Sequence, residues 1–513
     1  MKNILIIGLI LFSCCSCNSF LKEYSQDLVR VQTIGDLDEL LVGSAYYAAG
    51  YSYISNYNLY TVGESYNLSL HFMADELKQN TETSYGDLKK AFEDYFGYFT
   101  WQRDAGIDRR GTSVSDEGAD WKKTYGYINA TNMILHELGE VSVSGDKEEA
   151  DKIRIEGESC FLRALYYFTL VNMYAEPYVP SKAEITPGVP LKLTPYVEDK
   201  EYSRTTLTEV YNQILEDLER AERCLEQSEH KSLYRADINA VYLLTSRVYL
   251  YMQDYKNARK YAQMVLDWND ALVDLKSFYD EDNVFTSQNP EVLFSMGGHF
   301  LSYYIYGDDY YSDEYPFYIS DDLLNAFKSK EDLRKGIYIQ EVEDDLYGYK
   351  KIYWGKAHFG SPCSVSDNFL FRTSEAYLNL AEAAAFDNDE ATAREAITTL
   401  QNNRFSTPQT INESGNALID LIREERQREL CLEGHRWFDL RRYMVCEKYP
   451  WTKTIRHLYT DFQSGYPYKP EGTRLFELLP NDKAYTLAFP KEVLDFQNTL
   501  STNERPDRLP INQ

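Results

Sequence analysis

Two segments of the chain carry the same pattern of small and apolar residues, and this pattern constrains the fold more than any other feature. The first occurrence lies between residues 242 and 265, and the second lies 135 positions later. The matching residues are Tyr242, Ser246, Tyr249, Ala258, Ala262 and Val265, followed by Tyr377, Ala381, Ala384, Ala393, Ile397 and Leu400. Small residues let two helices approach closely, and larger ones fill the seam between them. The pattern predicts two helical hairpins.

The spacing within each set follows positions 4, 8, 11, 20, 24 and 27 of a tetratricopeptide repeat (TPR). A helical hairpin of another kind is the alternative. A further helix is expected from Thr206, where Thr206 and Glu209 form a capping box. Helical periodicity also covers residues 36–49, 121–138, 153–174, 237–252, 255–267, 373–386, 390–403 and 415–432. We therefore predict a mainly α fold in which the repeat is discontinuous.

The chain opens with MKNILIIGLILFSCCSCNSF, in which Lys2 precedes nine apolar or small residues. This is the shape of an export signal, and it is too short to span a bilayer. The cysteines at its end suggest a bacterial lipoprotein site, with Cys14, Cys15 and Cys17 as competing acceptors of the acyl chains. An ordinary secretory signal with bystander cysteines is the alternative. Lipidation would anchor the protein to a membrane without making it span one.

The charge balance excludes one class of partner. The chain has 53 basic and 81 acidic residues, for a net charge of −28. Such a surface repels phosphate backbones, so we expect no nucleic-acid binding. The 45 tyrosines are the most unusual part of the composition. Tyrosine joins a flat apolar face to a polar tip and suits wet recognition surfaces as well as cores.

Residues 422–443 read IREERQRELCLEGHRWFDLRRY, a charged stretch with an aromatic pair near its end. Opposite charges fall at i,i+3 and i,i+4 spacing, which indicates a helix. Gly434 interrupts this helix, and Trp437 and Phe438 offer large surfaces to bury. For the chemistry of these residues, we favour a structural ion network around a helix junction.

The same stretch resembles the C-terminal signature of the SusD/RagB family of outer-membrane lipoproteins. The matching residues are Arg423, Glu425, Arg426, Glu429, Leu430, Glu433, Gly434, Arg436, Trp437, Phe438, Asp439, Leu440, Arg441 and Arg442. Residues 154–180, 289–295 and 371–383 resemble further segments of the family. Beyond residue 445 the resemblance weakens, and residues 489–500 match only loosely the closing segment of the family.

The resemblance implies a particular organisation of the chain. Asn18-Ser19-Phe20-Leu21 is similar to the opening of mature family members, which makes Cys17 the expected lipidation site after a signal peptide of residues 1–16. Residues 17–513 would then form a single SusD-like domain, with an N-terminal part of about 18–230 and a C-terminal part of about 285–513. The implied fold is a TPR-like scaffold whose long loops and few short strands form the ligand face.

Motifs of catalysis or metal binding are missing from the sequence. There is no H-E-x-x-H, no G-x-S-x-G and no phosphate-binding glycine loop. His71 with Asp75 and Glu76 has plausible ligand spacing, but we interpret it as a helix surface. The five cysteines after the signal lack metal-ligand spacing and are expected to be buried free thiols: Cys160, Cys224, Cys363, Cys431 and Cys446. We therefore expect no enzyme activity, no metal and no cofactor.

Two aromatic loop regions point to binding. Residues 50–118 include Trp101 followed by Gln102, Arg103 and Asp104, and residues 296–318 hold seven tyrosines together with Asp308 and Asp309. An aromatic ring can cover the apolar face of a sugar while polar side chains hydrogen-bond its hydroxyls. By their location in the resembling family, the expected ligand contacts are Trp101, Tyr98 and Tyr306, followed by Tyr304 and Tyr310.

The resemblance implies a lipid-anchored protein of the outer membrane that faces the cell exterior. It would bind an oligosaccharide without cleaving it and pass it to a SusC-like TonB-dependent transporter. Three alternatives remain open: a peptide-binding RagB-like lipoprotein, a helical-repeat adaptor with no glycan ligand, and a secreted glycoside hydrolase, which would need a pair of carboxylates that the sequence does not single out.

Overall fold

The computed structural model describes residues 31–511 except 48–50, 56–57, 63–65, 82–87, 115–118, 279–283, 297, 299–300, 306–315, 353–364, 464–468 and 498. The longer helices of this part are α4 (Leu88–Phe99), α5 (Ala119–Glu137), α6 (Asp146–Tyr174), α7 (Leu207–Leu225), α8 (Ile238–Tyr251), α9 (Tyr255–Trp268), α13 (Thr373–Phe386), α14 (Glu390–Asn402), α15 (Asn416–Glu429) and α16 (His435–Met444). Shorter ones are α2 (Ile34–Leu40), α3 (Ser69–Met73), α10 (Leu301–Ile305), α11 (Asp321–Ala326), α12 (Arg334–Ile337) and α17 (Lys491–Phe496).

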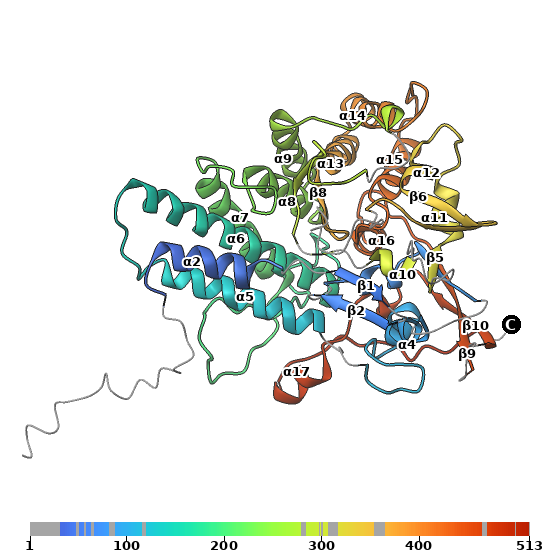
Figure 1. The fold of residues 1–513 in the computed structure, drawn as a ribbon, viewed down its shortest axis with the longest axis horizontal. Coiled ribbons are helices and arrows are strands. Elements are labelled where there is room, and N and C mark those ends of the chain that lie inside the picture. Colours follow the sequence, from blue (N-terminus) through green and yellow to red (C-terminus); the bar gives the residue numbers. More distant parts are fainter. Residues whose placement is uncertain are drawn as a thin grey trace, which may run out of the picture.

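Both predicted hairpins are confirmed. They are α8–α9 and α13–α14, and α9 also packs against α13, so that the four helices form one body at the top of Figure 1. Side-chain carboxylates cap the starts of three of these helices, at Asp237, Asp254 and Asp389. The small residues lie in the seams as expected, and the Ser246 hydroxyl donates to the Ala258 carbonyl at 2.9 Å.

The other predicted helices form with shifted ends. The capping box of Thr206 and Glu209 opens α7 as predicted. Helix α6 begins seven residues before the predicted position 153. The helix expected over 36–49 is α2, which passes at Leu41–Ala45 into a wider π-type turn. Helices α6 and α7 approach closely at Gly157, where a Cβ atom would lie 2.8 Å from the Cβ of Cys224.

The strands pair only in twos within the described residues, and all five pairs are antiparallel. They are β1 (Tyr51–Ser55) with β2 (Asn58–Val62), β3 (Leu77–Gln79) with β5 (Phe317–Ile319), β4 (Val292–Phe294) with β8 (Phe371–Arg372), β6 (Ile339–Glu343) with β7 (Leu346–Tyr349), and β9 (Ile455–Phe462) with β10 (Pro470–Leu478). The pairs β3–β5 and β4–β8 join segments far apart in sequence. The mainly helical class with a few short strands is confirmed.

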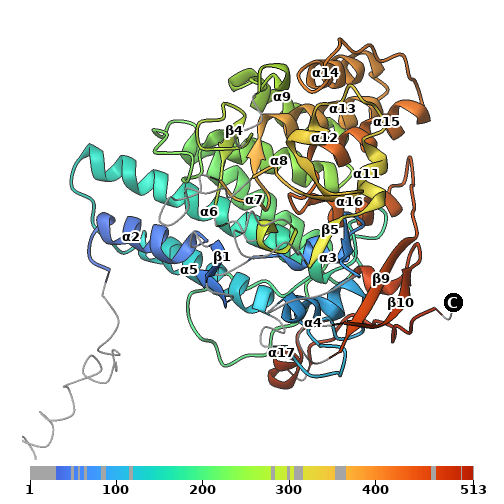
Figure 2. The same ribbon diagram turned by 45° about the vertical axis from the view of Figure 1, so that its right-hand side comes forward.

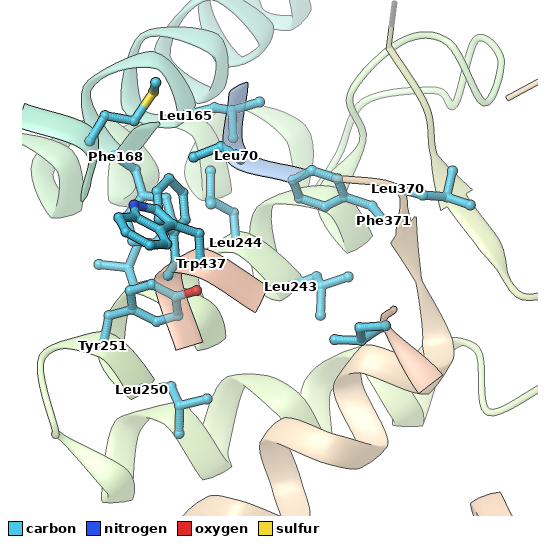
Figure 3. Close-up of a cluster of buried hydrophobic side chains, with 14 of the residues drawn as sticks. Leu70, Leu165, Phe168, Leu243, Leu244, Leu250, Tyr251, Leu370, Phe371 and Trp437 are labelled. Atoms are coloured by element: carbon cyan, nitrogen blue, oxygen red, sulfur yellow. The ribbon is translucent and has the colours of Figure 1, made fainter. Parts of the chain in front are cut away.

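Residues 422–443 lie in the interior, as the ion-network interpretation predicts. Gly434 has φ +82° and separates α15 from α16. Trp437 is fully buried, next to Phe168 of α6 and Tyr251 of α8 (Figure 3). Except for Glu424, the charged side chains of this stretch are buried as well, and most of their partners come from other segments rather than from the same helix. Examples are Arg436 with Asp75 at 2.7 Å and Arg334 with Glu429 at 3.0 Å.

Buried titratable groups predict how stability depends on pH. Burial raises the pKa of Glu76 to about 8. Between pH 4.5 and 8 the folded protein therefore keeps a proton on this carboxyl that the unfolded chain loses, and stability falls as pH rises through this window. Burial lowers the pKa of His71 and of His457 to about 4, so stability falls as pH drops from 6.5 towards 4. Below pH 6.5, the loss of stability caused by the two histidines as pH falls is larger than the gain caused by Glu76. Above pH 6.5, both histidines are neutral in the folded and the unfolded state, and of these three groups only Glu76 still changes stability with pH.

We therefore expect the free energy of unfolding to peak near pH 6.5 and to fall by about 1–2 kcal/mol at pH 8. Urea unfolding at pH 5 to 9 measures this profile. In Glu76→Gln most of the decline between pH 6.5 and 8 should disappear, while the decline below pH 6.5 should remain; a small alkaline decline is left because the hydrogen bond to Asp237 raises the pKa of the part-exposed His230. An unchanged alkaline decline in that variant would show that Glu76 is not its source.

Candidate functional site

The two aromatic regions meet in the structure, but the residues that meet lie on the helices α4 and α10 and not in loops as predicted. Pairing of β3 with β5 places residues 77–79 beside residues 317–319. Near this pair, Tyr95 of α4 contacts Tyr304 of α10, with ring centroids 5.4 Å apart, and stacks on Phe72 of α3 at 4.0 Å. Tyr98 lies one turn further along α4, and its ring centroid is 6.4 Å from that of Tyr95. The predicted contacts Tyr98 and Tyr304 are thus joined through Tyr95, a residue that the sequence reasoning did not select.

Tyr98 is half-buried and lines a cleft of about 610 Å³, which we call the Tyr98 cleft. One wall is the loop of residues 103–113 after α4, and the other is the C-terminal segment of residues 487–505, which includes α17. Helix α17 lies close to α4 at the lower side of the molecule in Figures 1 and 2.

The lining of the Tyr98 cleft combines apolar surface with hydrogen-bonding groups. Ile107, Phe489 and Leu494 contribute apolar side chains. Ser113 and Thr502, which carry hydroxyl groups, belong to the same lining. This composition suits a ligand that presents both C–H faces and hydroxyls.

The C-terminal wall is the part that sequence reasoning missed. Asn503 holds it in place, because its side-chain amide donates to the carbonyls of Tyr174 at 2.6 Å and Leu487 at 2.7 Å. The loose match of residues 489–500 to the closing segment of the resembling family was the available signal. Nothing in that match indicated that the segment reaches α4, which precedes it by about 390 residues.

The prediction that Trp101 offers a ring to a ligand is wrong for this structure. Its side chain is 0% exposed, and its indole N–H donates to the Met73 carbonyl at 3.0 Å. The ring stacks on His457 at 4.4 Å, and His457 in turn stacks on Phe99 at 4.1 Å. Trp101 adopts φ +52°, which ends α4 and turns the ring inward. Its neighbours Arg103 and Asp104 are exposed and line the cleft.

The remaining predicted residues divide in two groups. Tyr304 is half-buried, and burial raises the pKa of its hydroxyl to about 12. It packs edge-on against Phe72 at 5.6 Å and contributes no atoms to the Tyr98 cleft. Tyr306, Tyr310 and the predicted lipidation site Cys17 lie outside the described residues, as do Asp308 and Asp309.

His71, Asp75 and Glu76 do not lie on a helix surface, contrary to the sequence interpretation. All three are buried because α3 packs against α16. Asp75 forms ion pairs with Arg436 at 2.7 Å and Lys453 at 2.6 Å, which hold the pKa of its carboxyl well below the usual value despite burial. In the described ranges, no group of three or more His, Cys, Asp or Glu side chains could hold a metal ion.

Four of the five cysteines after the signal are buried free thiols, as predicted: Cys160, Cys224, Cys431 and Cys446. Cys363 lies outside the described residues. None of the helices in the part of the chain that the structure describes is long and apolar enough to span a bilayer.

Two family models match the chain. The model described as "SusD family" matches residues 238–503, and the one described as "Starch-binding associating with outer membrane" matches residues 70–250. Among curated proteins, the chain is 24% identical to the SusD-like protein P2 of Formosa agariphila over 63% of its length and 71% of that protein. It is 29% identical to the SusD-like protein P25 of the same organism, over 41% of the chain and only 38% of that relative.

Solved structures share the fold along nearly the whole chain. A SusD superfamily protein from Bacteroides thetaiotaomicron is 20% identical, with a TM-score of 0.66 over 92% of this chain and 100% of that one. A SusD-like carbohydrate binding protein from Bacteroides vulgatus is 18% identical, with a TM-score of 0.66 over 93% and 99% of the two chains.

Proposed function

The chain belongs to the SusD family, and from that premise and the Tyr98 cleft we propose that it binds an oligosaccharide and does not cleave it. The observation that carries the proposal is the Tyr98 ring at the edge of a cleft of about 610 Å³ whose lining also includes hydroxyl-bearing and charged residues. A ring in this position covers one face of a sugar, and the surrounding polar groups select its hydroxyls. Several weak contacts of this kind also permit release.

The proposal includes delivery of the captured oligosaccharide to a SusC-like TonB-dependent transporter of the outer membrane. The family model for residues 70–250 supports the membrane association through its description. A lipid anchor on Cys17 would hold the protein at the outer face of the cell, where polymer fragments are met. Transport energy would be used by the transporter, so this chain needs no catalytic group.

Replacing Tyr98 with alanine is expected to weaken oligosaccharide binding by about tenfold or more, because the variant loses the exposed part of the ring. Affinity electrophoresis against a panel of neutral and acidic polysaccharides finds the ligand, and isothermal titration calorimetry then measures the dissociation constant. Tyr234→Ala is the matched control, since Tyr234 is 45% exposed and lies outside the cleft lining.

Thermal unfolding of both variants accompanies the titration, because Tyr98 also contacts Tyr95. If Tyr98→Ala remains folded and binds the ligand as tightly as the wild type, the cleft is not the binding site. If no polysaccharide of the panel binds the wild type, the proposed function itself is wrong.

A further inference from the structure

The charge around the Tyr98 cleft differs in sign from the charge of the whole chain. Its charged lining residues are Arg103, Lys491, Arg505, Asp104 and Glu504. Two of them are paired with residues outside the lining: Arg103 with Asp507 at 2.7 Å, and Glu504 with Lys483. This leaves Lys491 and Arg505 as two cations of the lining against one carboxylate, that of Asp104. In a chain of net charge −28, a cleft with an excess of positive charge is a local exception.

Arg505 is a buried cation without a carboxylate partner. It is 4% exposed, and it donates to the carbonyls of Gln102 at 3.2 Å and Thr486 at 3.0 Å. Its Nη2 atom has no hydrogen-bond partner within the described residues. No described carboxylate lies within ion-pair distance of it. Backbone carbonyls solvate the guanidinium only in part, so its positive charge is left for another group to balance.

Two neighbouring arginines have the same kind of environment. Arg204 lies over the Phe489 ring of the cleft at 4.9 Å and donates to Asn503 at 2.9 Å and to the Pro187 carbonyl at 2.8 Å. Arg441 donates to the carbonyls at the C-terminal end of α6 and to the Thr486 hydroxyl. The negative end of the α6 dipole balances part of the Arg441 charge.

The pKa directions of the arginines agree with this geometry. Burial lowers the pKa of Arg441 and of Arg505 to about 10, and it also lowers the pKa of Arg204. By contrast, neighbouring carboxylates raise the pKa of Arg334 and Arg372 in the core, despite complete burial. Of these three arginines, Arg505 lines the cleft, while Arg204 lies over the lining residue Phe489 and Arg441 contacts Thr486 next to the lining residue Leu487.

We propose that the Tyr98 cleft is a subsite for an acidic group of the oligosaccharide, either the carboxylate of a uronic acid or a sulfate ester. This inference rests on the proposed function and names the substrate class. Lys491 is exposed on the rim and contacts the acidic group. Arg505 lies beneath and attracts the group through the weakly screened protein interior.

A second hollow of the molecule has the opposite character. The groove of about 480 Å³ between α7 and the α8–α9 hairpin is lined by Glu216, Glu219, Glu222 and Glu226, with Arg223 as its cation. Arg223 is paired with Glu219 at 3.0 Å. The groove would repel an acidic sugar, so of these two hollows the charge favours the Tyr98 cleft.

Calorimetric titration of the full chain with three probes of equal length tests the inference. The probes are tetragalacturonate as the uronate, a κ-carrageenan tetrasaccharide as the sulfate ester, and maltotetraose as the neutral sugar. At least one acidic probe should bind about tenfold or more tighter than maltotetraose at low salt, and this advantage should shrink at high salt. Which acidic probe binds distinguishes carboxylate from sulfate recognition.

The variants separate charge from folding. Lys491→Gln should weaken binding of the acidic probe by about threefold or more, and Lys330→Gln, which removes an exposed charge outside the cleft, should leave it unchanged. Arg505→Gln should weaken it by about tenfold or more, and Arg505→Lys should restore part of the loss. If Arg505→Gln does not fold, the comparison of Lys491→Gln with Lys330→Gln still tests the inference, because Lys491 is exposed.

Two outcomes would overturn the inference in different ways. If maltotetraose and both acidic probes bind equally well, or Lys491→Gln behaves like Lys330→Gln, the acidic subsite is wrong and the proposed function stands. If neither these probes nor the polysaccharide panel binds, the proposed function is wrong as well.

Discussion

Replacement of Glu429 by alanine is expected to lower the free energy of unfolding by about 3–5 kcal/mol, because it leaves buried cations without their shared partner. One Glu429 oxygen accepts from Arg372 at 2.6 Å, and both oxygens accept from Arg404 at 2.9 and 3.0 Å. The second oxygen also accepts from Arg334 at 3.0 Å. All four side chains are fully buried. Urea unfolding followed by circular dichroism measures the loss.

Glu424→Ala is the matched control, because it makes the same substitution in the same helix at a side chain that is 50% exposed. Its ion pairs with Lys328 and Arg428 span 3.4 and 3.8 Å, and their loss should cost about 1 kcal/mol or less. Equal stability losses in the two variants would contradict the central position of Glu429 in the ion network.

Trp101→Ala is expected to destabilise the protein by about 3–5 kcal/mol, as is typical when a buried aromatic side chain leaves a cavity. The variant removes the stacking on His457 and the hydrogen bond to the Met73 carbonyl. Met73 and His457 belong to α3 and β9, so the loss loosens contacts between distant parts of the chain. Thermal and urea unfolding measure the effect.

Trp268→Ala provides the comparison, since Trp268 is 66% exposed at the end of α9 and its removal should change stability by less than about 1 kcal/mol. A Trp101 variant that remains as stable as the Trp268 variant would show that the ring is not a core residue. The result also guides binding studies, because lost binding in Trp101→Ala would report unfolding rather than a lost ligand contact.

The helices were predictable because their signals are local. Repeating small and apolar residues predicted α8–α9 and α13–α14, and the capping box predicted the start of α7. Gly434 marked the junction of α15 and α16, where the backbone adopts φ +82°. Such signals depend on residues only a few positions apart, so the sequence displays them directly.

The candidate site was predicted only in part, because aromatic side chains look alike whether they line a core or a ligand surface. Tyr98 and Trp101 lie three residues apart, yet the first lines the cleft and the second is buried against His457. His457 is more than 350 residues away in sequence, and no local pattern indicates that it stacks on Trp101. The C-terminal wall of the cleft was missed for the same reason.

By itself, the sequence determined the helical scaffold and the family, since both depend on short-range spacing and on the signature of residues 422–443. The tertiary structure decided which charges and rings face a ligand. Glu429 meets Arg404, Arg372 and Arg334 across 25, 57 and 95 residues of sequence. Arg505 is buried against the Gln102 carbonyl, 403 residues earlier, with no carboxylate partner among the described residues. Burial and the choice of partner are properties of the packed chain, because they depend on long-range contacts that hydrophobic periodicity does not encode.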